Sequence, residues 1–387
     1  MKYKLGDICQ SISETSGLEN SEFVYPINTS DVFQGRILDN IKSIEIKQIK
    51  GQFKKIFKKN DILYSEIRPI NQHHALIDFE KTENFLASTK LMVIRANEDI
   101  ILSKYLYIFL TSLPIINQLQ KEAETRSGTF PQITFGANIA PLEIELPSIP
   151  HQVKVIKFLT SIDKKIEINK KINKNLLEIF DSFFLNFISE NSSDIPINFL
   201  THIIEIKDGT HDSPKEQLEG KYLITSKNLK EFSVNKLNAY KISMEDYNKA
   251  NQRSEVEPFD ILMSMIGTVG NIAFILDNEI DFAIKNIALF KTSRNLEYKY
   301  FIYGFLRSNI FKTFINNSLV GSTQKYISLK SLRDLQLPIP SSDRIKDFNK
   351  RIESIFCIIQ KNLGEINTLI QLKETILPRV LSGEVEL

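Results

Sequence analysis

The sequence predicts an α+β protein in which two α/β domains in tandem are separated by two long antiparallel helices. The helices are expected to form an intramolecular coiled coil, so that the chain has a pseudo-two-fold arrangement. Two long stretches of helical periodicity predict the helices, and a set of matching segments at an offset of roughly 200 residues predicts the two domains. The predicted boundaries are residues 1–148, 149–190, 191–338 and 339–387.

The first long helix is predicted because no proline or glycine follows Pro150 until Pro196. Its apolar residues recur in steps of three and four, which is typical of a heptad seam. A helix of about 38 residues is roughly 57 Å long at ~1.5 Å per residue, so it needs a partner along its length. The predicted seam comprises Ile162, Ile166, Asn169, Asn173, Leu176, Phe180, Phe183 and Phe187.

A partner of similar length lies between Pro340 and Pro378 in the same chain. Both helices follow a Leu-Pro phrase, at Leu146-Pro147 and at Leu337-Pro338, and proline near the first turn is a helix-start signal. About 150 residues separate the two helices, so we expect them to pair antiparallel. The alternative is two unrelated surface helices, each packed on its own domain. The second predicted seam comprises Asn349, Ile352, Phe356, Ile359, Leu363, Ile366 and Ile370.

The two domains are predicted from segments that match in kind and order. Short apolar runs bounded by turn residues predict strands, and runs with helical spacing predict helices. In the first half, strands are expected at residues 61–68 and 91–95, helices at 104–113 and 115–124, and a loop at 125–132. In the second half, the matching segments are residues 259–267, 287–290, 301–308 and 320–326. We interpret the chain as a tandem duplication of one domain followed by one long helix.

Composition favours a protein of the cytoplasm. Of 387 residues, 42% are hydrophobic and 25% are charged, with a net charge of +2, so bulk charge does not indicate a polyanionic partner. Cys9 and Cys357 lie far apart without metal-like spacing, which fits a reducing compartment. The N-terminal segment has no apolar core typical of a signal peptide, and no apolar run is long enough to predict a membrane span.

Motifs for catalysis are absent from the sequence. It contains no Gly-x-Gly pair, no Gly-Lys-Ser/Thr phosphate loop, no Pro-Pro dipeptide, no Gly-x-Ser-x-Gly elbow and no His-Glu-x-x-His zinc motif. His73 and His74 are adjacent and have no Cys or third His nearby, so we predict no metal site. A self-contained methyltransferase or nuclease is therefore disfavoured.

Lysine clusters and polar loops favour nucleic-acid binding. Seven lysines lie in residues 41–60 and seven in residues 151–174, and lysines neutralise phosphates, although the second cluster equally fits a solvated helix face. Side chains that read base edges concentrate in a few loops, although each one alone also fits turn or capping chemistry. The predicted DNA-binding residues are Lys54, Lys55, Ser65, Arg68, Gln72, His73, Arg126, Thr129, Thr210, His211, Lys227, Asn228, Arg253, Lys285, Asn286, Ser322, Thr323, Gln324 and Lys325.

Several phrases in this order resemble the specificity (S) subunit of Type I restriction–modification systems, over essentially the whole chain. They include Asp208-Gly209-Thr210-His211, Gly267-Thr268-Val269-Gly270-Asn271, Gly321-Ser322-Thr323-Gln324-Lys325, and the close at Leu377-Pro378-Arg379. The first half departs from this pattern, because residues 127–132 lack the Gly-Ser-Thr-Gln-Lys wording.

The resemblance implies two target-recognition domains, each of which reads one half of a bipartite double-stranded DNA sequence, with the helix pair as spacer. It implies that this chain is not an enzyme and holds no cofactor. Two modification subunits would bind S-adenosylmethionine and dock on the helices, through a surface expected along Ile162, Ile166, Asn169, Leu176, Phe180, Ile352, Phe356, Ile359, Leu363 and Ile366. Restriction subunits, which use ATP, would join the complex. The competing hypothesis is a coiled-coil scaffold that joins proteins without reading bases.

Overall fold

The computed structural model describes residues 1–15, 22–39, 41–126, 130–190, 195–236, 239–321 and 325–381. The contacts divide the chain into unit 1, Met1–Glu167 with Ile366–Leu387, and unit 2, Ile168–Glu365. Each long helix therefore contributes one part to each unit. No helix in the described ranges is long and apolar enough to cross a membrane.

Unit 1 is built on an antiparallel sheet of order β2-β11-β8-β9 and a second sheet of order β6-β3-β10-β7, in which β3 and β10 are parallel. The strands β1 and β12 pair antiparallel, as do β4 and β5. The bounds are β1 Lys2–Lys4, α1 Leu5–Ile8, β2 Cys9–Ile12, β3 Phe23–Ile27, β4 Val32–Phe33, β5 Arg36–Ile37, β6 Ile44–Glu45, β7 Phe53–Lys55, β8 Ile62–Ser65, β9 His74–Leu76, β10 Phe85–Ser88, β11 Leu91–Ala96, α2 Ser103–Leu110, α3 Leu113–Arg126 and β12 Glu143–Glu145.

The central strands of unit 1 are buried on both faces. Ile62 and Tyr64 of β8 pack with α2 and the first part of the long helix α4 (Ile149–Glu190), whereas Leu63 faces a separate cluster with Ile27 and Val32. Alternate residues of a strand point to opposite faces, so a continuous apolar run is what a strand between two layers requires. The strands and helices predicted at residues 61–68, 91–95, 104–113 and 115–124 are confirmed as β8, β11, α2 and α3.

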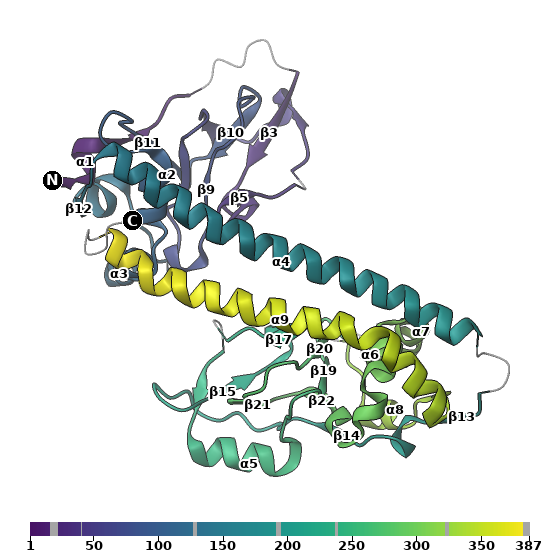
Figure 1. Ribbon diagram of the computed structural model, residues 1–387. Coiled ribbons are helices and arrows are strands. Elements are labelled where there is room, and N and C mark those ends of the chain that lie inside the picture. Colours follow the sequence, from purple (N-terminus) through teal and green to yellow (C-terminus); the bar gives the residue numbers. More distant parts are fainter. Residues whose placement is uncertain are drawn as a thin grey trace. The chain divides into compact units, whose positions relative to one another are not determined.

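Unit 2 contains an antiparallel sheet of order β14-β22-β19-β20 and a sheet of order β18-β15-β21, in which β15 and β21 are parallel. The helix α5 lies against β21 and β15 (Figure 1). The bounds are β13 Ile197–Phe199, β14 Ile206–Asp208, β15 Lys221–Ile224, β16 Leu229–Lys230, β17 Ser233–Val234, β18 Lys241–Ile242, α5 Met244–Ser254, β19 Ile261–Ser264, β20 Ile272–Phe274, β21 Phe282–Ile284, β22 Ile287–Phe290, α6 Lys299–Arg307, α7 Asn309–Ser318, α8 Leu329–Arg333 and β23 Gln336–Pro338.

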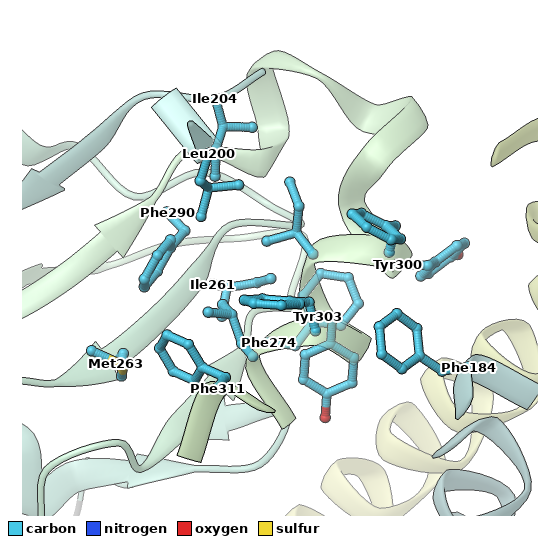
Figure 2. Close-up of a cluster of buried hydrophobic side chains, with 14 of the residues drawn as sticks. Phe184, Leu200, Ile204, Ile261, Met263, Phe274, Phe290, Tyr300, Tyr303 and Phe311 are labelled. Carbon is cyan, nitrogen blue, oxygen red and sulfur yellow. The ribbon is translucent and has the colours of Figure 1, made fainter. Parts of the chain in front are cut away.

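The sheet β14-β22-β19-β20 packs its inner face against aromatic side chains from the helices (Figure 2). Phe274 stacks on Tyr303 of α6 with ring centroids 4.7 Å apart, and Tyr303 lies 5.8 Å from Phe180 of α4. The guanidinium of Arg307 donates through Nε and Nη2 to Asp181 of α4 at 2.8 and 2.7 Å. Aromatic packing and one bidentate ion pair thus hold the second part of α4 on the α/β body of unit 2.

The two units share one plan. Strand orders β2-β11-β8-β9 and β14-β22-β19-β20 correspond, and each unit has one parallel pair in its second sheet. A buried aspartate precedes the equivalent strands β8 and β19: Asp61 pairs with Arg95, and Asp260 pairs with Lys291. The residue before each aspartate has a positive φ, 72° at Asn60 and 70° at Phe259. These matches support the predicted duplication.

The long helices α4 and α9 (Ser342–Leu381) pair antiparallel, as predicted (Figure 1). Within unit 1, Lys373 Nζ lies 2.6 Å from Asp163. Within unit 2, Asn169 donates to Glu365 at 2.8 Å, and Asn362 donates to Asn173 at 2.8 Å. The partner numbers fall along α9 as they rise along α4, which fixes the direction of the pairing. Asn169 and Asn173 of the first predicted seam are therefore buried and hydrogen bonded to the partner helix, which can fix register.

Three details of the helix prediction were wrong. Phe183 and Ile370 are 40% and 38% exposed, whereas the neighbouring Phe184 is 3% exposed. An α-helix has 3.6 residues per turn, so a strict heptad line drifts around its surface. Phe184 instead packs against Phe301 of α6. Gly304 of α6 makes room, since a Cβ there would lie 2.4 Å from the Phe184 ring. The helix α9 also continues past Pro378, because Val380 and Leu381 are buried in the core of unit 1.

The remaining seam residues lie as follows. Leu176, Phe187 and Leu363 are half-buried against the core of unit 2, where Leu177 is the more deeply buried neighbour. Ile166 and Asn349 are also half-buried. The buried members are Ile162, Asn169, Asn173, Phe180, Ile352, Phe356, Ile359 and Ile366.

Candidate nucleic-acid interface

Unit 2 presents a polar cluster where β14 ends. The chain passes from Asp208 through Gly209 to Thr210, which forms a parallel bridge with Lys285 in the turn between β21 and β22. Only glycine fits at position 209, because a Cβ would lie 2.4 Å from the carbonyl oxygen of Ile284. Asn286 adopts a left-handed φ of 54° and donates its backbone N–H to Thr210 at 3.2 Å. The glycine of the Asp-Gly-Thr-His segment is therefore required by a close approach of two backbones.

The carboxylate of Asp208 organises the side chains of this cluster. His211 Nε2 lies 2.9 Å from Asp208 Oδ2, and its Nδ1 lies 2.7 Å from Asn286 Oδ1. Arg253, in the last turn of α5, donates to Asp208 Oδ1 through Nη2. The Asp208 side chain is 6% exposed, whereas those of His211 and Arg253 are 62% and 57% exposed. A buried acid thus holds two solvent-facing groups.

Further polar groups surround this network. Lys285 Nζ donates to Ser213 Oγ at 2.5 Å, and Lys249 of α5 donates to Asp212 at 3.0 Å. The hydrogen bond and charge of Lys249 lower the pKa of Asp212. Cationic, imidazole and amide groups together suit contacts to phosphates and to base edges. Of the predicted residues, the structure brings together Thr210, His211, Arg253, Lys285 and Asn286 in this cluster.

In unit 1 the predicted residues surround a tight turn between β8 and β9. Arg68 and Gln72 have positive φ values of 44° and 56°, and flank the 3₁₀ turn η3 (Pro69–Asn71). The β4–β5 hairpin packs on this turn: Gln34 donates its backbone N–H to Gln72 at 3.0 Å, and its side chain donates to the Gln72 side chain at 2.8 Å. His73 Nδ1 lies 2.8 Å from the carbonyl oxygen of Val32. The turn and hairpin therefore form one polar surface.

The loops predicted to match between the halves occupy equivalent positions. Gln132 forms a bridge with Ile67 just after β8, and Tyr326 forms a bridge with Ile266 just after β19. Lys325 is exposed beside this second bridge. The central residues of both loops, Thr129, Ser322, Thr323 and Gln324, lie outside the described residues, as does the side chain of Arg126.

Three predicted DNA contacts conflict with the structure. Ser65 is 2% exposed and exchanges hydrogen bonds with the backbone of Ile67, and Asn228 is 2% exposed within a capping box with Thr225. Lys55 donates to the carbonyl oxygens of Thr89 and Leu91 at 3.0 and 2.9 Å, and burial lowers its pKa. These side chains serve internal hydrogen bonding. Lys54 and Lys227 are exposed.

Sequence reasoning missed several residues of these surfaces. In unit 1 they are Phe33, Gln34 and Arg36 of the β4–β5 hairpin, and in unit 2 they are Lys249 and Ser213. The sequence of unit 1 did contain a turn signal at Gln34-Gly35, because a polar residue followed by glycine is common in two-residue hairpin turns. In the structure these two residues have φ values of 44° and 97°, as such a turn requires. Among the described residues, no group of three or more His, Cys, Asp or Glu is placed to hold a metal ion.

His74 in β9 is buried, with a pKa lowered by that burial to about 4 from 6.5. Its Nδ1 lies 2.9 Å from the Tyr107 hydroxyl, and among the described residues its Nε2 has no hydrogen-bond partner. His74 takes up a proton near pH 6.5 in the unfolded chain but only near pH 4 in the folded chain. Unit 1 should therefore lose stability as pH falls through this window. The free energy of unfolding should fall by about 3 kcal/mol, and this loss should be nearly complete at pH 4.

The measurement is the urea midpoint of unfolding at pH values from 7.5 to 4, with circular dichroism as the signal. Compared with wild type, the His74→Gln variant should show a shallower loss over the window. His202→Gln, which changes an exposed histidine, is the matched control and should follow the wild-type curve. Parallel curves for wild type and His74→Gln would contradict the assignment.

Comparison with known proteins finds Type I specificity subunits. The sequence model of the Type I restriction modification DNA specificity domain matches residues 1–178. The chain is also 40% identical over 190 residues to the Type I restriction enzyme HindI specificity subunit of Haemophilus influenzae, an alignment that covers 48% of this chain and 41% of that protein. The chain is therefore similar to Type I specificity subunits. The resemblance inferred from the sequence is thus confirmed.

Other specificity subunits also match over longer spans. The MjaIX specificity subunit of Methanocaldococcus jannaschii is 24% identical over 375 residues, covering 89% of this chain and 82% of that protein. The solved structure of the Type I restriction-modification S subunit from M. genitalium aligns with a TM-score of 0.50 at 14% identity, covering 98% of this chain and 96% of that one. The structural likeness supports the fold.

Proposed function

We propose that this chain is the DNA-specificity subunit of a Type I restriction–modification complex. Residues 1–148 and 191–338 would be two target-recognition domains, each reading one half of a bipartite sequence in double-stranded DNA. Residues 149–190 and 339–387 would form the helix pair that sets the gap between the halves. The protein would act in the cytoplasm without catalysing a reaction or holding a cofactor, while partner subunits use S-adenosylmethionine and ATP.

One observation carries this proposal: two units with one shared strand order display loop surfaces of different polar chemistry. The end of β14 in unit 2 carries His211, Arg253 and Lys285, whereas the exposed turn of unit 1 carries Arg68, Gln72 and His73. Two domains with the same strand order and different loop chemistry are suited to read different sequences. A scaffold that never touches bases would have no use for this pattern.

An apolar stripe on α4 supports docking of partner proteins. Ile168, Ile172, Ile179 and Phe183 are 53%, 39%, 47% and 40% exposed. Their spacing places them on one face of the helix, within the part that belongs to unit 2. Exposed apolar side chains in a row mark protein–protein contacts. We propose that modification subunits, two per complex, dock on the helices, and that restriction subunits join them.

Exchange of the second recognition domain tests the function. Residues 195–338 would be replaced by the corresponding domain of another family member, and the variant expressed with its modification subunits. Sequencing of methylated adenines should show a bipartite motif whose second half changes while the first half and the gap stay the same, since the helices are untouched. An unchanged motif would support the scaffold hypothesis instead.

A further inference from the structure

The network around Asp208 differs from the internal ion pairs of the same chain. Arg95 donates to both carboxylate oxygens of Asp61, through Nε at 2.7 Å and Nη2 at 2.8 Å, and 21% of the arginine side chain is exposed. Lys291, 3% exposed, is enclosed with Asp260. Arg253 instead uses Nη2 on Asp208 and keeps 57% of its side chain open.

This difference indicates a supporting role for Asp208. A pair that serves only folding would be expected to leave little of either partner exposed, as the pairs of Asp61 with Arg95 and of Asp260 with Lys291 do. Asp208 is the inner member of a group whose outer members, Arg253 and His211, face solvent from α5 and from the loop after β14. Guanidinium carries five N–H donors, so several remain available once Asp208 has accepted one. The carboxylate restricts the rotamers of the side chains that it holds, and this lowers the entropy lost on binding.

We propose that Asp208 is a positioning residue for base recognition, which aims Arg253 and His211 at a guanine in the second half-site. Arginine recognises guanine by donating two hydrogen bonds to O6 and N7 in the major groove. Both ring nitrogens of His211 are held, Nε2 against Asp208 and Nδ1 against Asn286, so the ring is fixed beside Arg253 and presents its edge to the same base. The turn beneath this group is fixed by Gly209 and by the left-handed Asn286. The inference rests on the proposed function and assigns residues and a base to one half of the motif.

The test compares methylomes of cells that express the complete complex with wild type, Asp208→Asn, Arg253→Ala or Arg253→Lys. Arg253→Ala should remove the preference for guanine at one position of the second half-site by about tenfold or more, which is the scale of one bidentate contact. Arg253→Lys should not restore it, because an ammonium group lacks the planar fork. Asp208→Asn should relax the same position, while the first half-site keeps full selectivity. Arg294→Ala is the matched control, because Arg294 is 64% exposed and paired with Glu257 at 3.2 Å outside the cluster.

The outcomes separate the inference from the function on which it rests. A wild-type methylome without a bipartite motif would overturn the proposed function and this inference with it. A bipartite wild-type motif that Arg253→Ala leaves unchanged overturns the inference alone. So does an Asp208→Asn variant that methylates every site less without relaxing any position, because that is the result of a structural role. Relaxation of one position shared by both variants, with Arg294→Ala like wild type, supports the proposal.

Discussion

Replacing Lys291 with alanine is expected to lower the free energy of unfolding of unit 2 by about 3–5 kcal/mol. Lys291 is 3% exposed and its Nζ donates to Asp260 at 2.7 Å, to Glu257 at 2.6 Å and to the carbonyl oxygen of Glu255 at 3.0 Å. Asp260 is fully buried, so removal of the lysine leaves a carboxylate without its counter-charge. Burial already raises the pKa of Asp260 against the stabilising effect of Lys291. Loss of the ammonium group would raise that pKa further.

Hydrogen–deuterium exchange of peptides from β19 and β22 in urea measures this effect within unit 2. Lys207→Ala is the control, since Lys207 pairs with Glu205 at 3.0 Å on the surface and such pairs contribute at most about 1 kcal/mol. The double variant Lys291→Met with Asp260→Asn should recover part of the loss, because neither charge is then buried. A Lys291→Ala variant as stable as the Lys207→Ala control would show that the buried pair is dispensable.

Phe180→Ala is the second change with a large expected effect, about 3–5 kcal/mol of unfolding free energy. Phe180 is fully buried on α4, with ring centroids 5.0 Å from Phe356 of α9 and 5.8 Å from Tyr303 of α6. The side chain therefore joins three helices at one point, and its removal leaves a cavity that aromatic neighbours cannot readily fill. The variant should melt at a lower temperature, and exchange should rise in both α4 and α9 within unit 2.

Phe183 provides a matched control three positions along the same helix. It is 40% exposed, so Phe183→Ala should change stability by less than about 0.5 kcal/mol. On the proposed function, this control should instead weaken binding of modification subunits, because Phe183 belongs to the apolar stripe. Equal stability losses for the two variants would mean that the buried face of α4 has been assigned incorrectly.

Strands and helices were predictable where their signal is local. Residues 287–290 form β22, and all four of its side chains are buried. A short apolar run bounded by polar residues predicts such a strand. The match of Asp61 with Asp260 was visible because similar residues surround both aspartates, at positions 60–68 and 259–267. The buried side of α4 was harder, because the choice between Phe183 and Phe184 depends on a glycine in α6, at position 304.

The candidate sites were only partly predictable. His211, Arg253 and Asn286 were named from residue type and loop position, but Ser65 and Asn228 are of the same types and are buried. Hydroxyl and amide side chains serve turns and base readout equally well, so type alone does not decide. Arg36 and Gln34 were missed because the short β4–β5 hairpin carries little apolar periodicity.

The sequence by itself determined two long helices, two sets of matching strands and the loops in which polar residues gather. Periodicity along one segment carries that information, because each helix or strand must bury one face. Only the tertiary structure decided which polar groups act together. Asp208 meets Arg253 from α5, His211 meets Asn286 from a turn far along the chain, and Phe180 meets Phe356 of the other helix. Such partners come together only when distant segments pack, and no local pattern specifies them.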